Sequence, residues 1–227
     1  MKNLVVLTGA GMSAESGIKT FRDADGLWEG HDVMEVATPE GFKRNPELVL
    51  EFYNQRRNQL KEVSPNEGHK NLAKLEAYYN VQIITQNVDD LHERAGSSNV
   101  LHLHGELRKV RSTYNPSLIY SWEDDLAFGQ KCEKGSQLRP DIVWFGEAVP
   151  MLEIAVEITE QADVLVIIGT SMQVYPAASL IDFIKPRTPI YFIDPKPNID
   201  PNNYQNIEII TSGAGLGTRE LIKKLVD

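Results

Sequence analysis

The N-terminal segment "NLVVLTGAGMSAESG" (residues 3–17) limits what this chain can fold into more than any other stretch. The apolar, β-branched run Asn3–Thr8 predicts a buried parallel strand. Gly9, Gly11 and Ala14 then match the pattern Gly-x-Gly-x-x-Gly/Ala, in which small residues allow a tight turn, a close approach of the backbone to a pyrophosphate and close helix–strand packing. The segment predicts a dinucleotide site, although a similar turn also occurs as a purely structural connection.

Short β-branched runs alternate with helical patterns along the rest of the chain. The further predicted strands are Val81–Thr85, Val100–Leu103, Asp141–Phe145, Asp163–Gly169, Pro189–Asp194 and Ile207–Thr211. The predicted helices are Pro46–Val63, Asn66–Tyr79, Leu152–Gln161, Pro176–Ile184 and Gly217–Val226. This alternation predicts an α/β fold with a Rossmann-like, doubly wound parallel sheet and helices on both faces.

Two stretches interrupt the alternation. Residues 29–63 hold a long helix and no strand, and residues 108–139 are polar and lack a clear period. We expect these stretches to pack together as a small domain, and residues 1–28, 64–107 and 140–227 to form the Rossmann-like domain. A cleft between two lobes is a usual place for a ligand.

Composition narrows the class of protein. The chain has 227 residues, of which 41% are hydrophobic and 24% charged, as in a globular protein with a sizeable core. A net charge of −9 argues against a nucleic-acid partner and permits a basic peptide as substrate. No apolar run reaches the ~20 residues of a membrane span, and the single cysteine fits a reducing compartment. We therefore expect a cytoplasmic protein without a membrane partner.

The glycine motif is not followed by the rest of a dehydrogenase fingerprint. A hydride-transferring unit reaches a second strand, ending in Asp or Glu, roughly 20 residues after the glycines. Here "IKTFRDADGLWEG" follows, and no strand pattern occurs before Val81. This departure weakens the interpretation of the dinucleotide as a hydride carrier, and a dehydrogenase stays only as a distant third alternative.

Five motifs resemble those of the sirtuins, which are NAD-dependent protein-lysine deacylases. They are "GAGMSAESGIKTFRDADGLW" (9–28), "TQNVDDLHERAG" (85–96), "HLHG" (102–105), "LRPDIVWFGE" (138–147) and "GTSMQVYPAASL" (169–180), in family order and across nearly the whole chain. The resemblance implies a Rossmann-type domain beside a small domain made of helical and zinc-binding insertions. It also implies that NAD is consumed as a co-substrate.

The resemblance implies that His104 of the His-Gly pair is the catalytic base, a role that suits an imidazole near neutral pH. His102 is expected to pack beside it or support it. In the implied mechanism the acyl oxygen of the modified lysine displaces nicotinamide, and His104 then draws a ribose proton so that the 2′-hydroxyl attacks the acyl carbon. The products are lysine, nicotinamide and 2′-O-acyl-ADP-ribose.

The resemblance also implies a set of NAD contacts. Asn87 and Asp89 are expected to act in catalysis around the nicotinamide ribose, Phe21 to shield the reaction centre, and Arg22 to lie near the phosphates. The set is Gly9, Ala10, Gly11, Ser13, Ala14, Glu15, Ile18, Phe21, Arg22, Trp28, Gln86, Asn87, Val88, Asp89, His104, Gly169, Thr170, Ser171, Asp194 and Ala214. Asp194 stands before Pro195 where sirtuins usually have Asn-x-Glu or Asn-x-Asp, and we expect it still to accept a bond from the adenosine ribose.

The substrate peptide is expected on a second set of residues. Val143–Glu147 resembles the strand to which the peptide adds as a further strand, opposite Val174–Tyr175. The peptide-binding residues are Val143, Phe145, Gly146, Glu147, Val174 and Tyr175. Phe145 and Gly146 fit the rim of such a site, whereas Val143 also fits a core strand.

Tyr53 and Arg56 lie three residues apart on the long predicted helix and therefore share one face. A phenol hydroxyl and a guanidinium can together bind a carboxylate, although an exposed helix surface is the alternative interpretation of the pair. Tyr-x-x-Arg and the small Ala37 are similar to the sirtuin class that removes succinyl and malonyl groups. The neighbouring Arg57 is expected to be solvated.

Most sirtuins carry two Cys-x-x-Cys pairs that bind zinc. Here the first pair falls on Ser112 and Asn115, and the second on Lys131 and Lys134, beside Cys132. These residues cannot supply four tetrahedral ligands. We expect no zinc and a small domain stabilised by packing.

Two other functions stay open. One is a sirtuin-like protein ADP-ribosyltransferase, against which Tyr53 and Arg56 count. The other is a catalytically silent NAD-sensing module, against which the Gln86–Asp89 set and His104 count. The oligomeric state is not predicted, and a monomer is compatible with the sequence.

Overall fold

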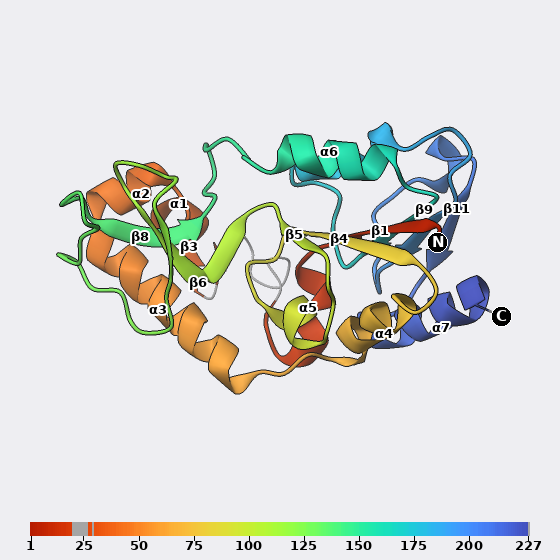
Figure 1. The fold of residues 1–227 in the computed structure, drawn as a ribbon, viewed down its shortest axis with the longest axis horizontal. Helices are drawn as coiled ribbons and strands as arrows, with labels where there is room; N and C mark the ends of the chain where they lie inside the picture. The colour runs from red at the N-terminus through yellow and green to blue at the C-terminus, as the bar shows by residue number, and fades with distance from the viewer. Residues whose placement is uncertain (20–26, 29, 227) are drawn as a thin grey trace.

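Six strands form one parallel sheet in the computed structural model, which describes residues 1–19, 27, 28 and 30–226 (Figure 1). They are β1 (Asn3–Thr8), β4 (Asn80–Thr85), β5 (Val100–His102), β9 (Val164–Ile168), β10 (Ile190–Ile193) and β11 (Ile207–Ile210). Their order in space is β11, β10, β9, β1, β4, β5.

The strand order reverses between β1 and β9. From β1 the chain adds β4 and then β5 toward one edge, and it later adds β9, β10 and β11 toward the other. This is the doubly wound arrangement, in which ligands bind outside the carboxyl ends of the strands at the point of reversal. The predicted α/β class and Rossmann-like sheet are confirmed.

Helices cover both faces of the sheet. Alternate residues of β1 point to opposite faces, and each set packs against its own group of helices. Leu4 and Val6 pack in a core with residues of α4 (Glu67–Leu75) and α7 (Ala214–Val226). Val5 and Leu7 pack in a second core with residues of α6 (Leu152–Glu160) and the 3₁₀ helix η4 (Ala177–Phe183). Figure 1 shows α6 on one side of the sheet and α4 with α7 on the other.

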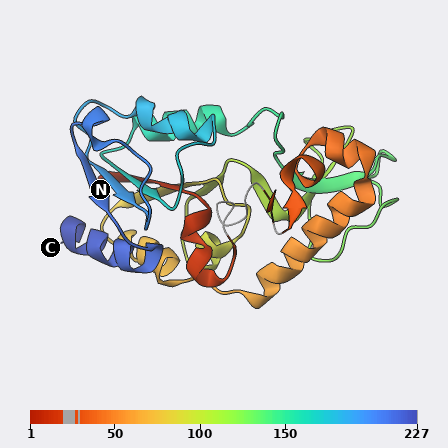
Figure 2. The ribbon, with the colours of Figure 1, turned by 180° about the vertical axis from the view of Figure 1, so that it is seen from behind.

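A second, smaller lobe lies beside the sheet, as Figure 2 shows from behind. It contains a three-stranded antiparallel sheet in the order β7, β6, β8 and the long helix α3. Its elements are β2 (Leu27–Trp28), β3 (His31–Asp32), α1 (Val33–Val36), α2 (Pro39–Arg44), α3 (Pro46–Glu62), β6 (Gly105–Ser112), β7 (Ile119–Ser121) and β8 (Leu138–Ile142). Helix α3 begins as predicted, with Pro46 in its first turn and the Asn45 side chain accepting from the Leu48 N–H.

The structure corrects several predicted elements. The region of residues 108–139 contains most of β6 and all of β7, and the strand predicted at Asp141–Phe145 is β8, which pairs antiparallel with β6. The predicted domain boundaries at residues 107/108 and 139/140 fall inside β6 and β8.

Two segments are 3₁₀ helices in the structure, one after the glycine motif and one at the helix predicted over Pro176–Ile184. The glycine motif leads into two short 3₁₀ turns, η1 (Ala10–Met12) and η2 (Ala14–Ser16), rather than an α-helix, and η4 is likewise a 3₁₀ helix. The remaining short elements are α5 (Leu91–Arg94) and η5 (Pro201–Asn203). Within the described ranges, no helix has the length and apolar character needed to cross a bilayer.

Candidate active site

Three loops lie side by side at the carboxyl edge of the sheet, around the point where the strand order reverses. The Gly9 N–H donates to the Ile168 carbonyl at 3.0 Å, and the Gly11 N–H donates to the Gly169 carbonyl at 2.9 Å. On the other side of β1, the Gln86 N–H donates to the Thr8 carbonyl at 2.9 Å. The backbone therefore joins the loops after β1, β4 and β9 into one surface.

The glycines of these loops are needed for contact within the chain itself. A Cβ atom on Gly11 would lie 2.6 Å from the Gly169 Cα, and one on Gly9 would lie 2.8 Å from the Gly169 carbonyl oxygen. Gly169 has a φ of +63°, in the left-handed region that favours glycine. Sequence reasoning ascribed Gly9 and Gly11 to the approach of a pyrophosphate, and it missed this packing of loop on loop.

His104 is held as a neutral proton acceptor. Its Nδ1 lies 3.0 Å from the Gln86 carbonyl oxygen. A carbonyl can only accept, so Nδ1 carries the hydrogen and the lone pair of the neutral ring is on Nε2. Burial lowers the pKa of His104, and the hydrogen bond to Gln86 offsets only part of that effect. The ring is therefore suited to act as a general base through Nε2.

His102 is in the opposite state. Its Nδ1 lies 3.1 Å from the Asn87 carbonyl oxygen, and its Nε2 lies 2.7 Å from the Glu93 carboxylate. Burial alone would lower the pKa of His102, but the hydrogen bond and charge of Glu93 raise it above its usual value. With both nitrogens donating, His102 fastens the loop after β4 to α5 and has no free nitrogen to accept a proton.

Ser13, Asn87 and Asp89 meet between the first two loops. The Ser13 hydroxyl donates to Asp89 Oδ2 at 2.8 Å, and Asn87 Nδ2 donates to the Ser13 hydroxyl at 3.1 Å. The other oxygen of Asp89 accepts from the Leu91 N–H. Burial raises the pKa of Asp89, although these hydrogen bonds oppose the rise. Three side chains predicted as NAD contacts thus form one buried polar group.

The other predicted NAD contacts are spread along the same edge. Gln86 Nε2 donates to the Thr170 hydroxyl at 3.2 Å, and the Glu15 carboxylate accepts from the Gly215 N–H at the start of α7 at 3.1 Å. Asp194 is buried and accepts from the Lys196 N–H at 2.8 Å. Ala214 is buried as the first residue of α7. Ala10 and Ala14 lie in η1 and η2, and Ser171 follows Thr170; Phe21 and Arg22 lie outside the described residues.

Arg56 borders a small pocket between α3 and the loop after β4. The pocket is lined by Ile18, Trp28, Arg56, Gln59, Leu60, Val88, Asp89 and Leu107. The structure therefore brings Arg56, predicted to bind substrate, beside Val88 and Asp89, predicted to bind NAD. The Arg56 guanidinium also lies 4.5 Å from the centre of the Phe52 ring.

Tyr53 and Ala37 lie in the core of the small lobe, against which Trp28 of the pocket wall packs. Both are buried, and Tyr53 has no exposed surface. The Tyr53 hydroxyl accepts a hydrogen bond from Trp144 Nε1 at 2.9 Å. Trp28 borders the pocket and packs edge-on against Tyr53, with 6.0 Å between ring centres. Trp28 therefore contacts the pocket on one side and the Tyr53 ring on the other.

The expectation that Arg57 is solvated is wrong. Only 1% of Arg57 is exposed, and its Nε donates to the Leu107 carbonyl at 2.9 Å. Its Nη1 donates to Asn54 Oδ1 at 2.8 Å and also reaches the Asp124 carbonyl. Arg57 therefore binds one backbone carbonyl of β6 and one of the chain between β7 and β8, and nothing local in the helix sequence indicates this.

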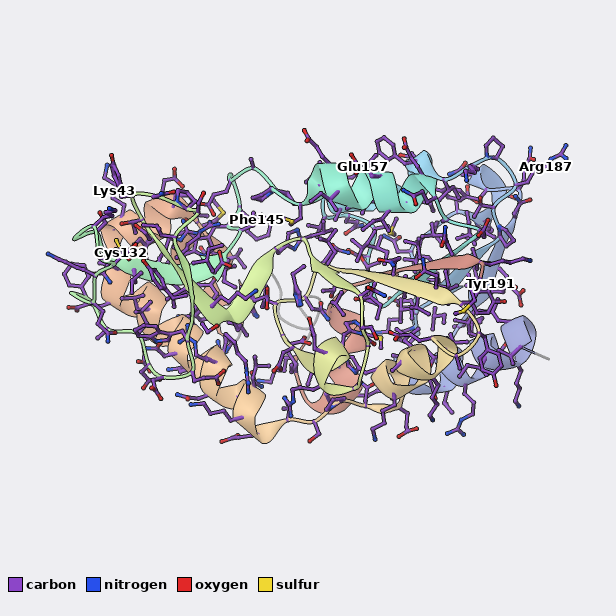
Figure 3. The ribbon with its side chains drawn as sticks, viewed as in Figure 1. Lys43, Cys132, Phe145, Glu157, Arg187 and Tyr191 are labelled. Carbon is purple, nitrogen blue, oxygen red and sulfur yellow. The ribbon has the colours of Figure 1, made fainter. Side chains whose placement is uncertain are left out.

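Residues Val143–Glu147 form a turn, whereas the sequence predicted a strand that continues to Phe145. Strand β8 ends at Ile142, and the Glu147 N–H donates to the Trp144 carbonyl. Gly146 has a φ of +88°. The Val143 N–H donates to the His104 carbonyl and the Phe145 N–H to the Ala37 carbonyl, both at 2.9 Å. These two hydrogen bonds connect the turn to the backbone of His104 and to that of Ala37 in the small lobe. Phe145 is exposed, and Figure 3 shows it on the side of that lobe that faces the sheet.

The Glu147 carboxylate holds this turn in place. It accepts two hydrogen bonds from Arg139, at 2.7 and 2.9 Å, and one from Arg111 at 3.1 Å. It also accepts from the Trp144 N–H at 2.8 Å. On the opposite lobe, Val174 accepts from the Ala178 N–H and Tyr175 is 73% exposed.

The small lobe keeps a polar contact at the positions of the absent zinc cysteines. Cys132 Sγ lies 3.3 Å from the Ser112 hydroxyl, which also accepts from the Tyr114 and Asn115 N–H groups. Figure 3 shows Cys132 at the end of the lobe far from the parallel sheet. Across the residues that the structure describes, no group of three or more His, Cys, Asp or Glu side chains is placed to hold a metal ion.

Comparison with known proteins gives consistent matches. A model described as the Sir2 family matches residues 9–176. The chain is 62% identical over 227 residues to a protein of Helicobacter pylori (strain ATCC 700392 / 26695) named NAD-dependent protein deacylase, covering 100% of this chain and 99% of that protein. Among solved structures, a Sir2 homolog–NAD complex has a TM-score of 0.87 at 43% identity, covering 99% and 89% of the two chains. A structure of Sir2 bound to acetylated peptide has a TM-score of 0.79 at 26% identity, covering 97% and 92%.

Proposed function

Because the chain belongs to the Sir2 family, we propose that it removes succinyl and malonyl groups from lysine side chains and retains some activity on acetyl groups. The general activity is that of an NAD-dependent protein deacylase, the name its close relatives carry. NAD is the co-substrate and acyl-lysine proteins are the substrates. The choice of acyl group and the roles of individual residues are the proposal.

The residues at the carboxyl edge of the sheet suit NAD by the chemistry of their donors and acceptors. Ser13, Asn87 and Asp89 offer a hydroxyl, an amide and a carboxylate in one buried group, which matches the hydroxyls of a ribose and the carboxamide of nicotinamide. When bound, NAD supplies a ribose carbon that is activated by its cationic leaving group. Asn87 and Asp89 would hold that ribose, and Ser13 keeps the two side chains together.

His104 would act as the base at this ribose. Its Nδ1 is occupied by the Gln86 carbonyl, so Nε2 is the atom that can take a proton from a ribose hydroxyl. Burial lowers its pKa, which keeps the ring neutral before it acts. His102 would support it indirectly by holding the Asn87 carbonyl and Glu93.

The observation that carries the acyl preference is the pocket that Arg56 shares with Val88 and Asp89. A guanidinium there would attract an acyl group that ends in a carboxylate and would do little for a neutral acetyl group. Tyr53 and the small Ala37 lie behind the same wall and would complete the acyl site. Val143, Phe145, Gly146, Val174 and Tyr175 would contact the peptide, whereas Glu147 acts on the turn that carries the first three.

A panel of acetyl-, malonyl-, succinyl- and glutaryl-lysine peptides with NAD tests the proposal, with nicotinamide release as the readout. We expect Arg56→Met to lower kcat/KM for the malonyl and succinyl peptides by about 30-fold, because a charge-assisted hydrogen bond is lost, and to affect the acetyl peptide far less. Arg44→Met, at an exposed position of α2 in the same lobe, is the matched control. An equal loss on all peptides in a folded Arg56→Met variant contradicts the acyl preference.

The same assay separates the other two functions. With labelled NAD, a deacylase puts the label in O-acyl-ADP-ribose, whereas an ADP-ribosyltransferase leaves it on protein. Binding of NAD without nicotinamide release would indicate a silent sensing module. We expect His104→Tyr to abolish product formation with every acyl peptide. The cytoplasmic location and the lack of a nucleic-acid partner stay predictions, supported by the single cysteine and the charge of −9.

A further inference from the structure

The Tyr53 hydroxyl is a buried donor whose hydrogen has no acceptor in the described part of the chain. Its oxygen accepts from Trp144 Nε1 at 2.9 Å. An indole N–H can only donate, so the phenolic hydrogen cannot point back at Trp144. A buried donor without an acceptor costs free energy and requires an explanation in a native protein. Burial also raises the pKa of Tyr53, so the hydroxyl keeps its hydrogen.

The Trp144 indole is held rigidly in this orientation. The Arg139 guanidinium lies over the indole, 3.3 Å from the ring centre, and donates twice to Glu147. The Trp144 N–H of the main chain donates to the same carboxylate at 2.8 Å. Phe42 packs against the indole with 5.3 Å between ring centres. Both the backbone and the ring of Trp144 are therefore fixed, and Nε1 stays directed at Tyr53.

Tyr53 and Arg56 follow each other by three residues on α3, so their side chains leave the helix on one face. Arg56 borders the pocket beside Asp89, and Trp28 lies between that pocket and Tyr53. A carboxylate in the pocket would have the Arg56 guanidinium in its wall, and the Tyr53 ring lies directly behind Trp28 of the same wall.

We infer that Trp144 is a positioning residue for acyl specificity: it holds the Tyr53 hydroxyl with its hydrogen available to the distal carboxylate of a malonyl or succinyl substrate. This inference rests on the proposed function and adds a residue to it. Trp144 acts only through Tyr53 and does not touch the acyl group. The Arg139–Glu147 pair acts through Trp144, because it holds the indole in place.

A double-mutant cycle tests the inference. Trp144→Phe removes the indole N–H and keeps an aromatic ring beside Arg139 and Phe42. We expect it to raise KM for a succinyl-lysine peptide by about tenfold, as for a weakened hydrogen bond to a charged group. The rise should be much smaller for an acetyl-lysine peptide. Tyr53→Phe should give a similar rise, and the double variant should rise no further, because the indole has no other route to the substrate.

Trp122→Phe is the matched control. Trp122 lies in the same lobe, and its buried Nε1 makes no hydrogen bond to any described residue, so losing that N–H should not change the ratio of the two KM values. The ratio of succinyl to acetyl KM is used because a change in the binding of NAD or of the peptide backbone, which both substrates share, cancels in it.

The outcomes separate this inference from the proposed function. If Arg56→Met and Tyr53→Phe change the ratio but Trp144→Phe does not, or if the effects of Trp144→Phe and Tyr53→Phe add, the inference on Trp144 is overturned and the acyl preference stands. If the wild type does not act on malonyl or succinyl peptides, or Arg56→Met leaves the ratio unchanged, the acyl preference fails and the inference fails with it. A changed ratio in both single variants without further change in the double variant supports it.

Discussion

Two histidines within one tripeptide have pKa values that are shifted in opposite directions. His102 donates from both ring nitrogens, to the Asn87 carbonyl and the Glu93 carboxylate, and its pKa is raised. His104 donates only from Nδ1, and burial lowers its pKa. Environments that push two pKa values apart are typical of pairs in which one group transfers a proton and the other does not. Sequence reasoning preferred His104 through a family resemblance; the hydrogen-bond partners now supply a physical reason.

We expect the fall of kcat/KM at low pH to be caused by protonation of His104. Its ring must be neutral to accept a proton, so activity is full at high pH and is lost as pH falls through a pKa below 6.5. We expect kcat/KM for an acetyl-lysine peptide, measured from about pH 5 to about pH 8, to fall only below that value. The acetyl peptide is chosen because it carries no distal carboxylate that titrates.

His102→Gln gives the control for this profile, since it removes the second titrating imidazole of the tripeptide. An acid limb that stays in place in His102→Gln is not caused by His102, as we expect if His104 is the base. A limb centred above pH 6.5 in the wild type would contradict a buried, neutral base.

At the scale of elements, the parallel strands could be predicted, whereas of the three-stranded antiparallel sheet only β8 was predicted, with shifted bounds. β1 and β9 are buried along nearly their whole length, so they appear in the sequence as continuous apolar runs. β6, with the sequence "GELRKVRS", has only three fully buried residues, and its register depends on β8, some thirty residues later in the chain. Such a strand has no local signal, because its partner lies far away in sequence.

The loop-on-loop contact of Gly11 and Gly169 predicts an asymmetry among glycine variants. Gly11→Ala puts a Cβ 2.6 Å from the Gly169 Cα, so we expect a loss of about 3 kcal/mol in the free energy of unfolding. Gly96→Ala has open space but a φ of +100°, and we expect a loss of about 1 kcal/mol from strain alone. Denaturant titration of both variants measures the difference. A Gly11→Ala variant as stable as Gly96→Ala would show that the two loops can separate freely.

On the scale of the whole molecule, a pair of buried histidines links the glycine loop to the helical layer. The rings of His69 and His92 meet with 4.8 Å between centres, and both side chains are buried. Asn66 caps α4 together with His69 and donates to the Met12 carbonyl, while His92 bonds to the Thr8 hydroxyl. Neither ring is near a charge strong enough to keep a proton, and burial lowers both pKa values, that of His69 to about 4.

Acid should therefore destabilise the fold through this pair. The unfolded chain binds protons near pH 6.5 and the folded chain binds them near pH 4, so stability is complete above pH 6.5 and falls between those values. For His69 the loss is about 3 kcal/mol. Urea titrations across this range should show His69→Gln, which can still cap α4, with a shallower fall than wild type. Parallel curves for the two proteins would exclude His69 as the cause.

Interruptions in the alternation of strands and helices led us to predict a second lobe. The sequence did not predict which side chains are buried inside that lobe. Arg57 looks like a surface residue in the sequence because its neighbours on α3 are polar, and only the folded insertion buries it. Tyr53 and Arg56 were selected as a pair on one helix face, yet Arg56 reaches the pocket while Tyr53 lies behind it. The three-residue spacing predicted that both side chains leave α3 on one face. How deeply each side chain is buried depends on which other segments pack against the helix.

Only Leu103 and His104 separate the last residue of β5, in the parallel sheet, from the first residue of β6, in the small lobe. His104, the predicted base, thus lies in a two-residue connection between the two lobes. A movement of one lobe against the other would therefore shift the backbone that carries His104, and it would change the direction of the imidazole ring as the space between the lobes widens.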